Sequence, residues 1–245
     1  MIITKENGYR IVMKEYLPGE NPGRCPVVIF SHGFGGNLRE IEHHGPGFAD
    51  AGIACIFFDF CGGGADSQSD GSMNEMTVLT EADDLTAVIK AVRKLDYADP
   101  DRIFLAGESM GGFVSAYVAS QMPEDIKGLV LWYPAFIIPE DARMRYEAGK
   151  TTALGLPIGP DYSKTAMNID IYNVISRYTN PVKIIHGDED TIVPLRYSEE
   201  ALRVYEQASL EVIKGAGHGF NGADSLRAEK LSVEFVKDCA GALSI

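Results

Sequence analysis

Basic residues are scarce in this sequence. Its 245 residues include 22 lysines and arginines against 35 aspartates and glutamates, which gives a formal net charge of −13. Nucleic acid and anionic membrane surfaces repel a chain with this charge, so neither is an expected partner. A neutral or weakly polar small-molecule substrate agrees better with the charge. A homodimer is one assembly that the sequence allows.

Cysteines are few and dispersed. The four are Cys25, Cys55, Cys61 and Cys239, and Cys55 falls in a strand that we predict to be buried. Their spacing matches neither a disulfide framework nor a zinc cluster. We therefore expect reduced thiols in a cytoplasmic protein, with no metal and no cofactor.

Long hydrophobic runs are also missing. No apolar stretch reaches the length that a bilayer demands. Residues 1–19 lack the basic start and long apolar core of a secretory signal. The sequence therefore predicts neither a membrane span nor secretion.

The chain nevertheless has enough apolar residues, 45%, for one α/β domain over residues 1–245. An antiparallel pair of strands is predicted between residues 2 and 16. Further strands are predicted near 26–31, 53–59, 102–106, 127–133, 182–186 and 210–213. Helices are predicted near 38–51, 76–95, 111–122, 195–207 and 223–240. This alternation predicts a mostly parallel, twisted sheet of about eight strands with helices on both faces.

The segment GESMGG, residues 107–112, lies between a predicted strand and an apolar helix. A sharp strand-to-helix turn strains its central residue and pushes that side chain out above the sheet, and Gly107 and Gly111 leave the room that the turn needs. The segment therefore predicts a nucleophilic serine, Ser109. The alternative is a serine in an ordinary glycine-containing loop.

A second glycine-containing turn, HGFGG, follows the strand at 26–31. Glycines allow the backbone to pass close to a substrate carbonyl. We expect the N–H groups of Phe34 and Met110 to form an oxyanion hole. A phosphate-binding loop is the alternative, but the spacing fits neither GxxxxGK[ST] nor GxGxxG followed by an acidic residue.

Three acidic residues follow another strand in the segment HGDEDTIVP, residues 186–194. A carboxylate in this position can orient a histidine and stabilise its protonated form. We assign this role to Asp190. Asp188 and Glu189 are better explained as parts of a solvated acidic turn.

The candidate base is His218, in the segment GAGHGF before the last predicted helix. It is the one histidine of five that follows both the serine and the acid in the chain. We interpret His32 and His186 as turn residues, and expect His43 and His44 to face water.

The order serine, acid, histidine, each after a successive strand, is the order in the α/β-hydrolase fold. The motifs GESMGG, HGFGG, HGDEDTIVP and GAGHGF resemble this superfamily over about the whole chain. The segment FFDFCGGGADSQSDG, residues 57–71, looks like the loop after its fourth strand. Among its members, the sequence is most similar to small bacterial cinnamoyl or feruloyl esterases, which carry an FDFxGxGxS segment and a short lid after the sixth strand.

This resemblance implies the same five roles for Ser109, Asp190, His218, Phe34 and Met110. Two positions depart from the narrower pattern. Gly63 stands where many relatives have histidine, and Met110 stands where some cinnamoyl esterases have glutamine. Methionine retains the backbone donor but changes the wall beside the acyl group.

Residues 135–170 interrupt the alternation of strands and helices and are rich in glycine and proline. We expect a small lid insertion that covers the serine and shapes the substrate pocket. Candidate contacts are Phe136, Ile137, Ile138, Met144, Tyr146, Leu154, Leu156 and Tyr162. About half of these side chains should instead pack within the lid itself.

Asp141 falls near the position of a lid acid that, in cinnamoyl esterases, can bond a phenolic hydroxyl. The glutamine that accompanies it there is replaced by Ala148. Asp141 is therefore either a substrate contact or a surface carboxylate paired with Arg143 or Arg145.

These features predict a serine carboxylesterase that cleaves short acyl, aromatic or hydroxycinnamoyl esters through an acyl-enzyme. A small serine peptidase or acylaminoacyl hydrolase is an alternative, since Glu140, Asp141 and Glu147 could bind an amino terminus. Thioesterase activity also stays open. A noncatalytic ligand-binding relative is a further alternative, which the intact motifs disfavour.

Overall fold

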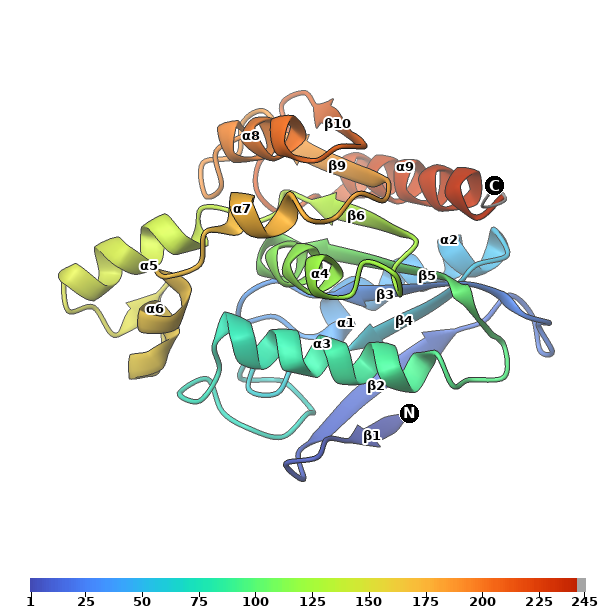
Figure 1. Ribbon diagram of the computed structural model, residues 1–245, viewed down its shortest axis with the longest axis horizontal. Coiled ribbons are helices and arrows are strands. Elements are labelled where there is room, and N and C mark those ends of the chain that lie inside the picture. Colours follow the sequence, from blue (N-terminus) through green and yellow to red (C-terminus); the bar gives the residue numbers. More distant parts are fainter. Residues whose placement is uncertain (242–245) are drawn as a thin grey trace.

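The computed structural model describes residues 1–241. Eight strands form one sheet in the order β1-β2-β4-β3-β5-β6-β9-β10 (Figure 1). Pairs β1–β2 and β2–β4 are antiparallel, and every other neighbouring pair is parallel. The strands are β1 (Ile2–Thr4), β2 (Arg10–Tyr16), β3 (Cys25–Ser31), β4 (Ala54–Phe58), β5 (Ala98–Glu108), β6 (Gly128–Trp132), β9 (Val182–Gly187) and β10 (Ala208–Ile213). The predicted α/β-hydrolase architecture is thereby confirmed.

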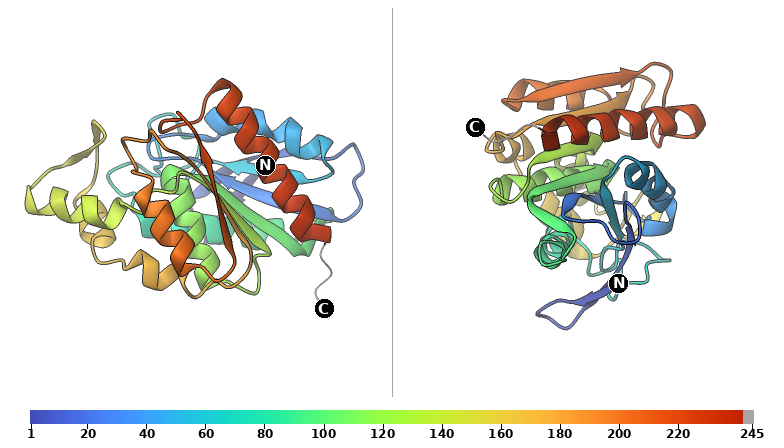
Figure 2. Two further views of the ribbon diagram at one scale, coloured as in Figure 1. Left: turned by 90° about the horizontal axis from the view of Figure 1, so that it is seen from above. Right: turned by 90° about the vertical axis from the view of Figure 1, so that its right-hand side faces the viewer.

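Helices cover both faces of the sheet. They are α1 (Leu38–Ile41), α2 (Gly45–Asp50), α3 (Val78–Val92), α4 (Ser109–Gln121), α5 (Ile138–Glu147), α6 (Pro160–Ala166), α7 (Ile171–Ile175), α8 (Arg196–Val204) and α9 (Gly222–Gly241). Helices α3, α4, α7 and α8 pack on one face, and α1, α2 and α9 pack on the other. The two views of Figure 2 show α9 running beside α2.

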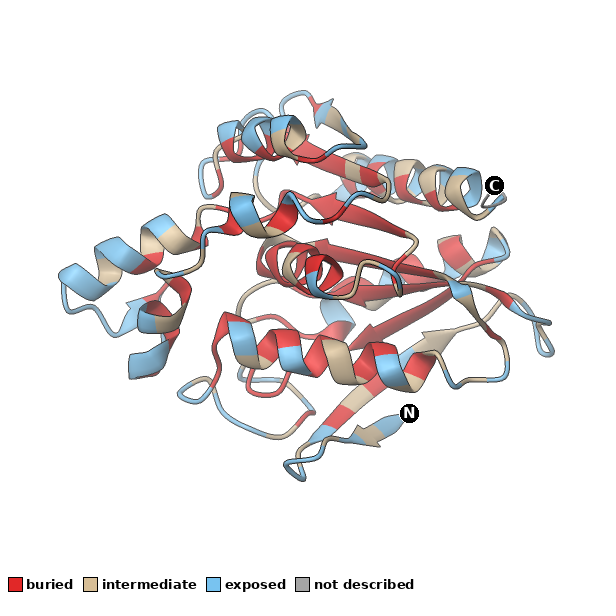
Figure 3. Ribbon diagram, viewed as in Figure 1, coloured by how far each residue is buried: buried red, intermediate tan, exposed pale blue. Residues whose placement is uncertain are grey.

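The central strands are buried on both sides. Along β3, Val27 and Ile29 belong to the core under α3 and α4, while Val28 and Phe30 belong to the core under α2 and α9. Figure 3 shows this burial as a continuous red sheet between the helical layers. Such strands read as near-continuous apolar runs in the sequence, which is why they could be predicted.

The prediction of one continuous helix over residues 38–51 was wrong. Helix α1 ends at Ile41, a 3₁₀ turn spans Glu42–His44, and α2 begins at Gly45. Pro46 has no backbone N–H and its ring collides with the preceding turn of a continuing helix. It fits at the start of α2, so the segment divides there.

Residues 135–170 hold α5, α6 and a two-stranded hairpin, β7 (Thr152–Ala153) and β8 (Leu156–Pro157). In Figure 1, α5 and α6 project from the rest of the molecule. Among the helices of residues 1–241, none is both long and apolar enough to cross a membrane.

The strand order changes direction beside β3. The chain passes from β3 to β4 on one side and then returns to add β5 on the other. In open α/β sheets, ligands bind at such a switch point, at the carboxyl ends of the strands. The loops that follow β3 and β5 carry HGFGG and GESMGG, which places both motifs at this point.

Candidate active site

Ser109 lies in the tight turn that joins β5 to α4. Its φ is 51°, in the left-handed region that side chains rarely adopt. The turn has no room beside it: a Cβ on Gly107 would lie 2.4 Å from the Gly111 carbonyl oxygen, and one on Gly111 would lie 2.3 Å from that of Ser31. The strained turn and the two glycines agree with the strand–turn–helix context predicted for GESMGG.

Three side chains from distant loops meet above the sheet. His218 Nε2 lies 3.0 Å from Ser109 Oγ, and His218 Nδ1 lies 2.7 Å from Asp190 Oδ2. A carboxylate only accepts hydrogen bonds, so Nδ1 carries the proton and Nε2 is left to accept from the serine hydroxyl. The fold thus brings together the three residues predicted from the order of the motifs.

Asp190 is fixed by several donors. Its Oδ1 accepts the backbone N–H groups of Ile192 and Val193, at 2.9 and 2.8 Å. Its Oδ2 faces His218 and also His186, whose Nε2 lies 3.2 Å away. Burial alone would raise the pKa of Asp190, but the hydrogen bonds from His186, His218 and Val193 outweigh it and hold that pKa well below its usual range. The carboxylate therefore stays ionised beside the histidine.

The neighbouring acids are arranged differently. Asp188 and Glu189 are exposed, and Asp188 Oδ1 accepts the N–H of Gly215. Only Asp190, which is 6% exposed, turns inward from this loop.

Phe34 and Met110 both line the space beside Ser109. Met110 is the second residue of α4, where the helix leaves its N–H groups without intrahelical partners. Phe34 belongs to the glycine-containing loop after β3, in which Gly35 has a φ of 72°. The residues of the two predicted oxyanion donors thus line the same cavity as Ser109.

That cavity is narrow, about 50 Å³, and its walls are mostly apolar. Its lining residues are Phe34, Ser109, Met110, Ala135, Ile137, Ile138, Asp141, Arg145, Ala153, Leu154, Tyr162, Ile192 and Val193. Insertion 135–170 contributes eight of these 13 residues. The size suits a short or flat apolar group.

The predicted lid contacts divide between this cavity and other places. Asp141 lines the cavity. Phe136 does not: it is 2% exposed and packs against Phe113 and Tyr172 in the core. Tyr146 does not either, because it is 52% exposed on the outer side of α5. Residue type alone does not tell a pocket wall from core, as at Phe136, or from exposed surface, as at Tyr146.

A pair of residues next to Ser109 was not predicted from the sequence. Tyr133, with a φ of 34°, donates its hydroxyl to Glu108 Oε2 at 2.6 Å, and its ring packs edge-on against His218 at 4.7 Å. Glu108 Oε1 also faces the N–H of Gly33. Burial raises the pKa of Glu108, although the bonds from Tyr133 and Gly33 oppose this. An acidic residue directly after the uncharged run at 103–107 was the available signal.

Three other histidines have structural partners. His32 and His186 are fully buried: Nδ1 of His32 donates to Gly33 O and its Nε2 accepts the Phe60 N–H, so it ties the loop after β3 to the loop after β4. The prediction that His44 faces water was wrong, because it is 2% exposed and lies 2.7 Å from Glu229. Burial lowers the pKa of His44 to about 3, which keeps this imidazole neutral.

The amino-acid sequence matches the serine aminopeptidase S33 family over residues 23–157, which is more than half of the chain. The chain belongs to the S33 family. The matched part of this S33 protein contains both HGFGG and GESMGG, and Asp190 and His218 lie beyond it.

Individual relatives are similar to this chain over more of its length than the family match. Est1E of Butyrivibrio proteoclasticus, in a structure with ferulic acid bound, has a TM-score of 0.89 at 28% identity, over 99% of this chain and 100% of that one. An uncharacterized protein of Mycobacterium tuberculosis is 27% identical over 222 residues, 89% of this chain and 71% of the relative. Alpha/beta hydrolase domain-containing protein 17C of Xenopus tropicalis is 28% identical over 206 residues, which are 81% of this chain and 57% of the relative. The S33 protein is a hydrolase of the α/β-hydrolase fold, and the expected resemblance to feruloyl esterases is confirmed.

Proposed function

We propose that this S33 protein is a serine carboxylesterase, with Ser109 as nucleophile, His218 as general base and Asp190 as the acid that orients it. The observation that carries the proposal is the unbroken chain from Ser109 Oγ through His218 to Asp190, with steps of 3.0 and 2.7 Å. These are hydrogen-bond distances suited to proton transfer.

In the proposed reaction, His218 Nε2 takes the Ser109 proton while Oγ attacks the ester carbonyl carbon. The negative oxygen formed is stabilised by the N–H groups of Phe34 and Met110, and ionised Asp190 stabilises the protonated imidazole. When the tetrahedral intermediate collapses, the alcohol leaves with the proton from His218. Water, deprotonated by His218, then attacks the acyl-enzyme and releases the acid and free Ser109.

Residues 135–170 serve as the lid in this proposal, within a single domain. Ile137, Ile138 and Tyr162 form an apolar wall over Ser109, which excludes water and favours a short acyl or aromatic group. The ferulic acid bound to Est1E supports hydroxycinnamoyl esters as one substrate class to test.

Peptide hydrolysis is the second candidate, because the family carries the description serine aminopeptidase. An aminopeptidase needs a carboxylate free to bind the substrate's amino terminus. Glu140 accepts the Tyr197 hydroxyl, and Asp141 faces the positive charge of Arg145. Glu147, the third lid acid, is exposed and does not line the cavity that contains Ser109. This arrangement favours the esterase.

The decisive measurement is burst release of p-nitrophenol from p-nitrophenyl acetate. Wild-type protein should give a stoichiometric burst and react with a fluorophosphonate probe, and Ser109→Ala should lose both. Ser176→Ala, which removes an exposed hydroxyl at the C-cap of α7, is the matched control. A persistent burst in Ser109→Ala would refute the assignment, and faster cleavage of aminoacyl p-nitroanilides than of esters would select the peptidase.

A further inference from the structure

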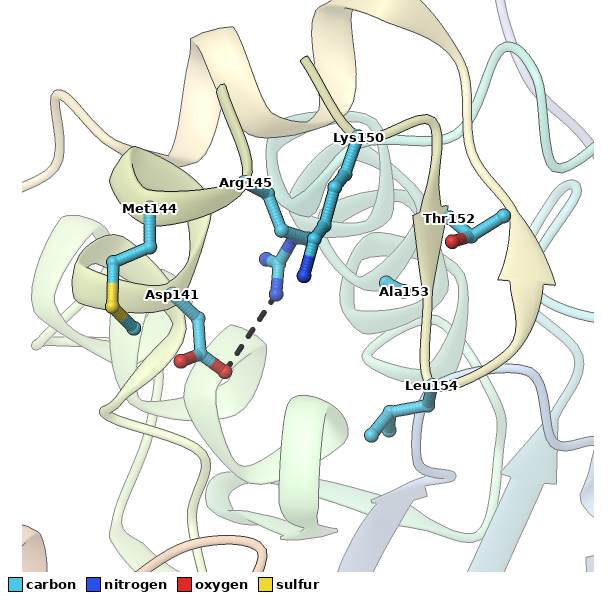
Figure 4. A pocket seen from close by; sticks show the side chains of 7 residues that line it. All are labelled: Asp141, Met144, Arg145, Lys150, Thr152, Ala153 and Leu154. Atoms are coloured by element: carbon cyan, nitrogen blue, oxygen red, sulfur yellow. Dashed lines mark ion pairs between the residues drawn. The ribbon is translucent and has the colours of Figure 1, made fainter. Parts of the chain in front are cut away.

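A second, wider cavity adjoins the space beside Ser109. It has a volume of about 390 Å³ and lies between α5 and the β7–β8 hairpin (Figure 4). It is lined by Asp141, Met144, Arg145, Lys150, Thr152, Ala153 and Leu154. Four of these, Asp141, Arg145, Ala153 and Leu154, also line the cavity that contains Ser109. A substrate held at Ser109 can therefore extend into this second space.

Arg145 lies at the boundary of the two cavities. Its side chain is 15% exposed, and its buried Nε has no hydrogen-bond partner among residues 1–241. Nη1 lies 3.6 Å from Asp141 Oδ2, which is close enough for charge attraction but too far for a hydrogen bond. The guanidinium otherwise lies over the Tyr162 ring, 5.7 Å from its centre. Unpaired buried donors are costly to a fold, so they mark a place where a ligand can supply the missing acceptors.

Lys150 adds a second positive charge. Figure 4 shows the ends of Asp141, Arg145 and Lys150 pointing toward the same space. Lys150 forms no ion pair with an acidic side chain among residues 1–241. Two cations and one carboxylate leave an excess of one positive charge at the cavity. The whole chain is strongly acidic, so this local sign is opposite to its overall charge.

We propose that this cavity binds a carboxylate on the substrate, at an end remote from the ester that Ser109 attacks. The planar fork of Arg145 matches the two oxygens of a carboxylate. A single negative charge balances the local excess, whereas a dianionic phosphate would overcompensate it next to Asp141. This proposal rests on the proposed esterase function, and it replaces the neutral substrate expected from net charge with a monoanionic one.

The test compares charged and neutral esters of equal length. One arm places the carboxylate on the acyl side, with p-nitrophenyl hydrogen suberate against its methyl ester. The other places it on the leaving group, with 4-acetoxybenzoate against methyl 4-acetoxybenzoate. In wild-type protein, kcat/KM for the charged ester should exceed that for the neutral one by about tenfold in one arm, and that arm identifies the side of the substrate that enters the cavity.

Arg145→Gln should reduce this ratio at least about tenfold, and Lys150→Gln should reduce it less, with an effect that weakens in salt. The ratio is the readout because a general disturbance of the lid lowers both rates together. Arg143→Gln is the matched control: it lies on the same helix, but its guanidinium donates to Met167 O on another side. A ratio near one in both arms of wild type, or an unchanged ratio in Arg145→Gln, overturns the proposal.

A binding measurement separates this site from the chemistry. Monomethyl suberate should raise the Tm of Ser109→Ala, and should not raise that of Ser109→Ala combined with Arg145→Gln. If esters are not cleaved but this difference is present, the carboxylate site stands and the esterase assignment fails. If esters are cleaved but the two Tm shifts are equal, the esterase stands and the carboxylate site fails.

Discussion

His186 lies 3.2 Å from Asp190 through its Nε2 atom, on the same carboxylate oxygen that accepts from His218. Nε2 also lies 2.8 Å from Val193 O, and Nδ1 lies 2.7 Å from Ser198 Oγ. Since Nε2 faces two acceptors, it carries the proton, and Nδ1 accepts from the serine. This buried imidazole therefore ties α8 to the loop that holds Asp190, and we describe it as a positioning residue.

Replacing His186 should affect catalysis more than binding. His186→Leu removes the donor to Asp190, which leaves the carboxylate less firmly oriented toward His218, so kcat should fall about tenfold while KM changes little. Steady-state kinetics on p-nitrophenyl acetate would measure this. Ser198→Ala, which retains Nε2, is the control and should have a smaller effect. A rise in KM at constant kcat would instead place His186 in substrate binding.

The turn at Ser109 should not accept a side chain at Gly111. A Cβ there would lie 2.3 and 2.4 Å from the carbonyl oxygens of Ser31 and His32. These are backbone atoms that cannot move aside, so Gly111→Ala should lower the free energy of unfolding by about 2–4 kcal/mol. Urea denaturation would measure it. Gly23→Ala, which has open space around it, should be nearly neutral, and equal effects of the two changes would contradict the tight turn.

Glu81 should make the protein less stable at neutral pH than near pH 4. It is completely buried on α3, and neither carboxyl oxygen has a hydrogen-bond partner in the part of the chain that the structure describes, residues 1–241. Burial, followed by the charge of Asp84, raises its pKa well above the usual range. The carboxyl of Glu81 loses its proton near pH 4.3 in the unfolded chain and at a higher pH in the folded chain. The free energy of unfolding therefore falls as the pH rises from the unfolded-state pKa toward the folded-state pKa.

Glu81→Gln removes this titration and should therefore stabilise the protein at pH 8, by about 1–3 kcal/mol. The gain should shrink toward pH 4, where the wild-type carboxyl is also neutral. Urea denaturation at both pH values would measure it. Asp83→Asn, an exposed position on the same helix, should show no such trend, and a gain for Glu81→Gln that is equal at pH 4 and pH 8 would contradict the raised pKa.

Much of the fold and the central geometry of the site could be predicted because their signals are local. Buried parallel strands are apolar runs, and Ser109, Asp190 and His218 each follow one of them within a few residues. Parallel strands place their carboxyl ends at one edge of the sheet, so sequence order alone indicated that these residues would meet.

The rest depended on contacts between distant residues. Buried His44 bonds through its imidazole to Glu229, which lies 185 residues away in the sequence. Tyr133, which follows β6, bonds to Glu108 at the end of the neighbouring strand β5. Phe136 is buried in the core, while its neighbour Ile137 lines the cavity. Composition and periodicity carry no information on such partners. For the same reason, net charge did not reveal the positive cavity at Arg145 and Lys150.

The strand order also bears on how the protein is synthesised. Ser109 follows a central strand, whereas Asp190 and His218 follow β9 and β10, which occupy one margin of the sheet and come late in the chain. A ribosome releases the nucleophile well before it releases the residues proposed to activate it. Under the proposed mechanism, the nascent polypeptide stays inert toward esters until its last strand docks.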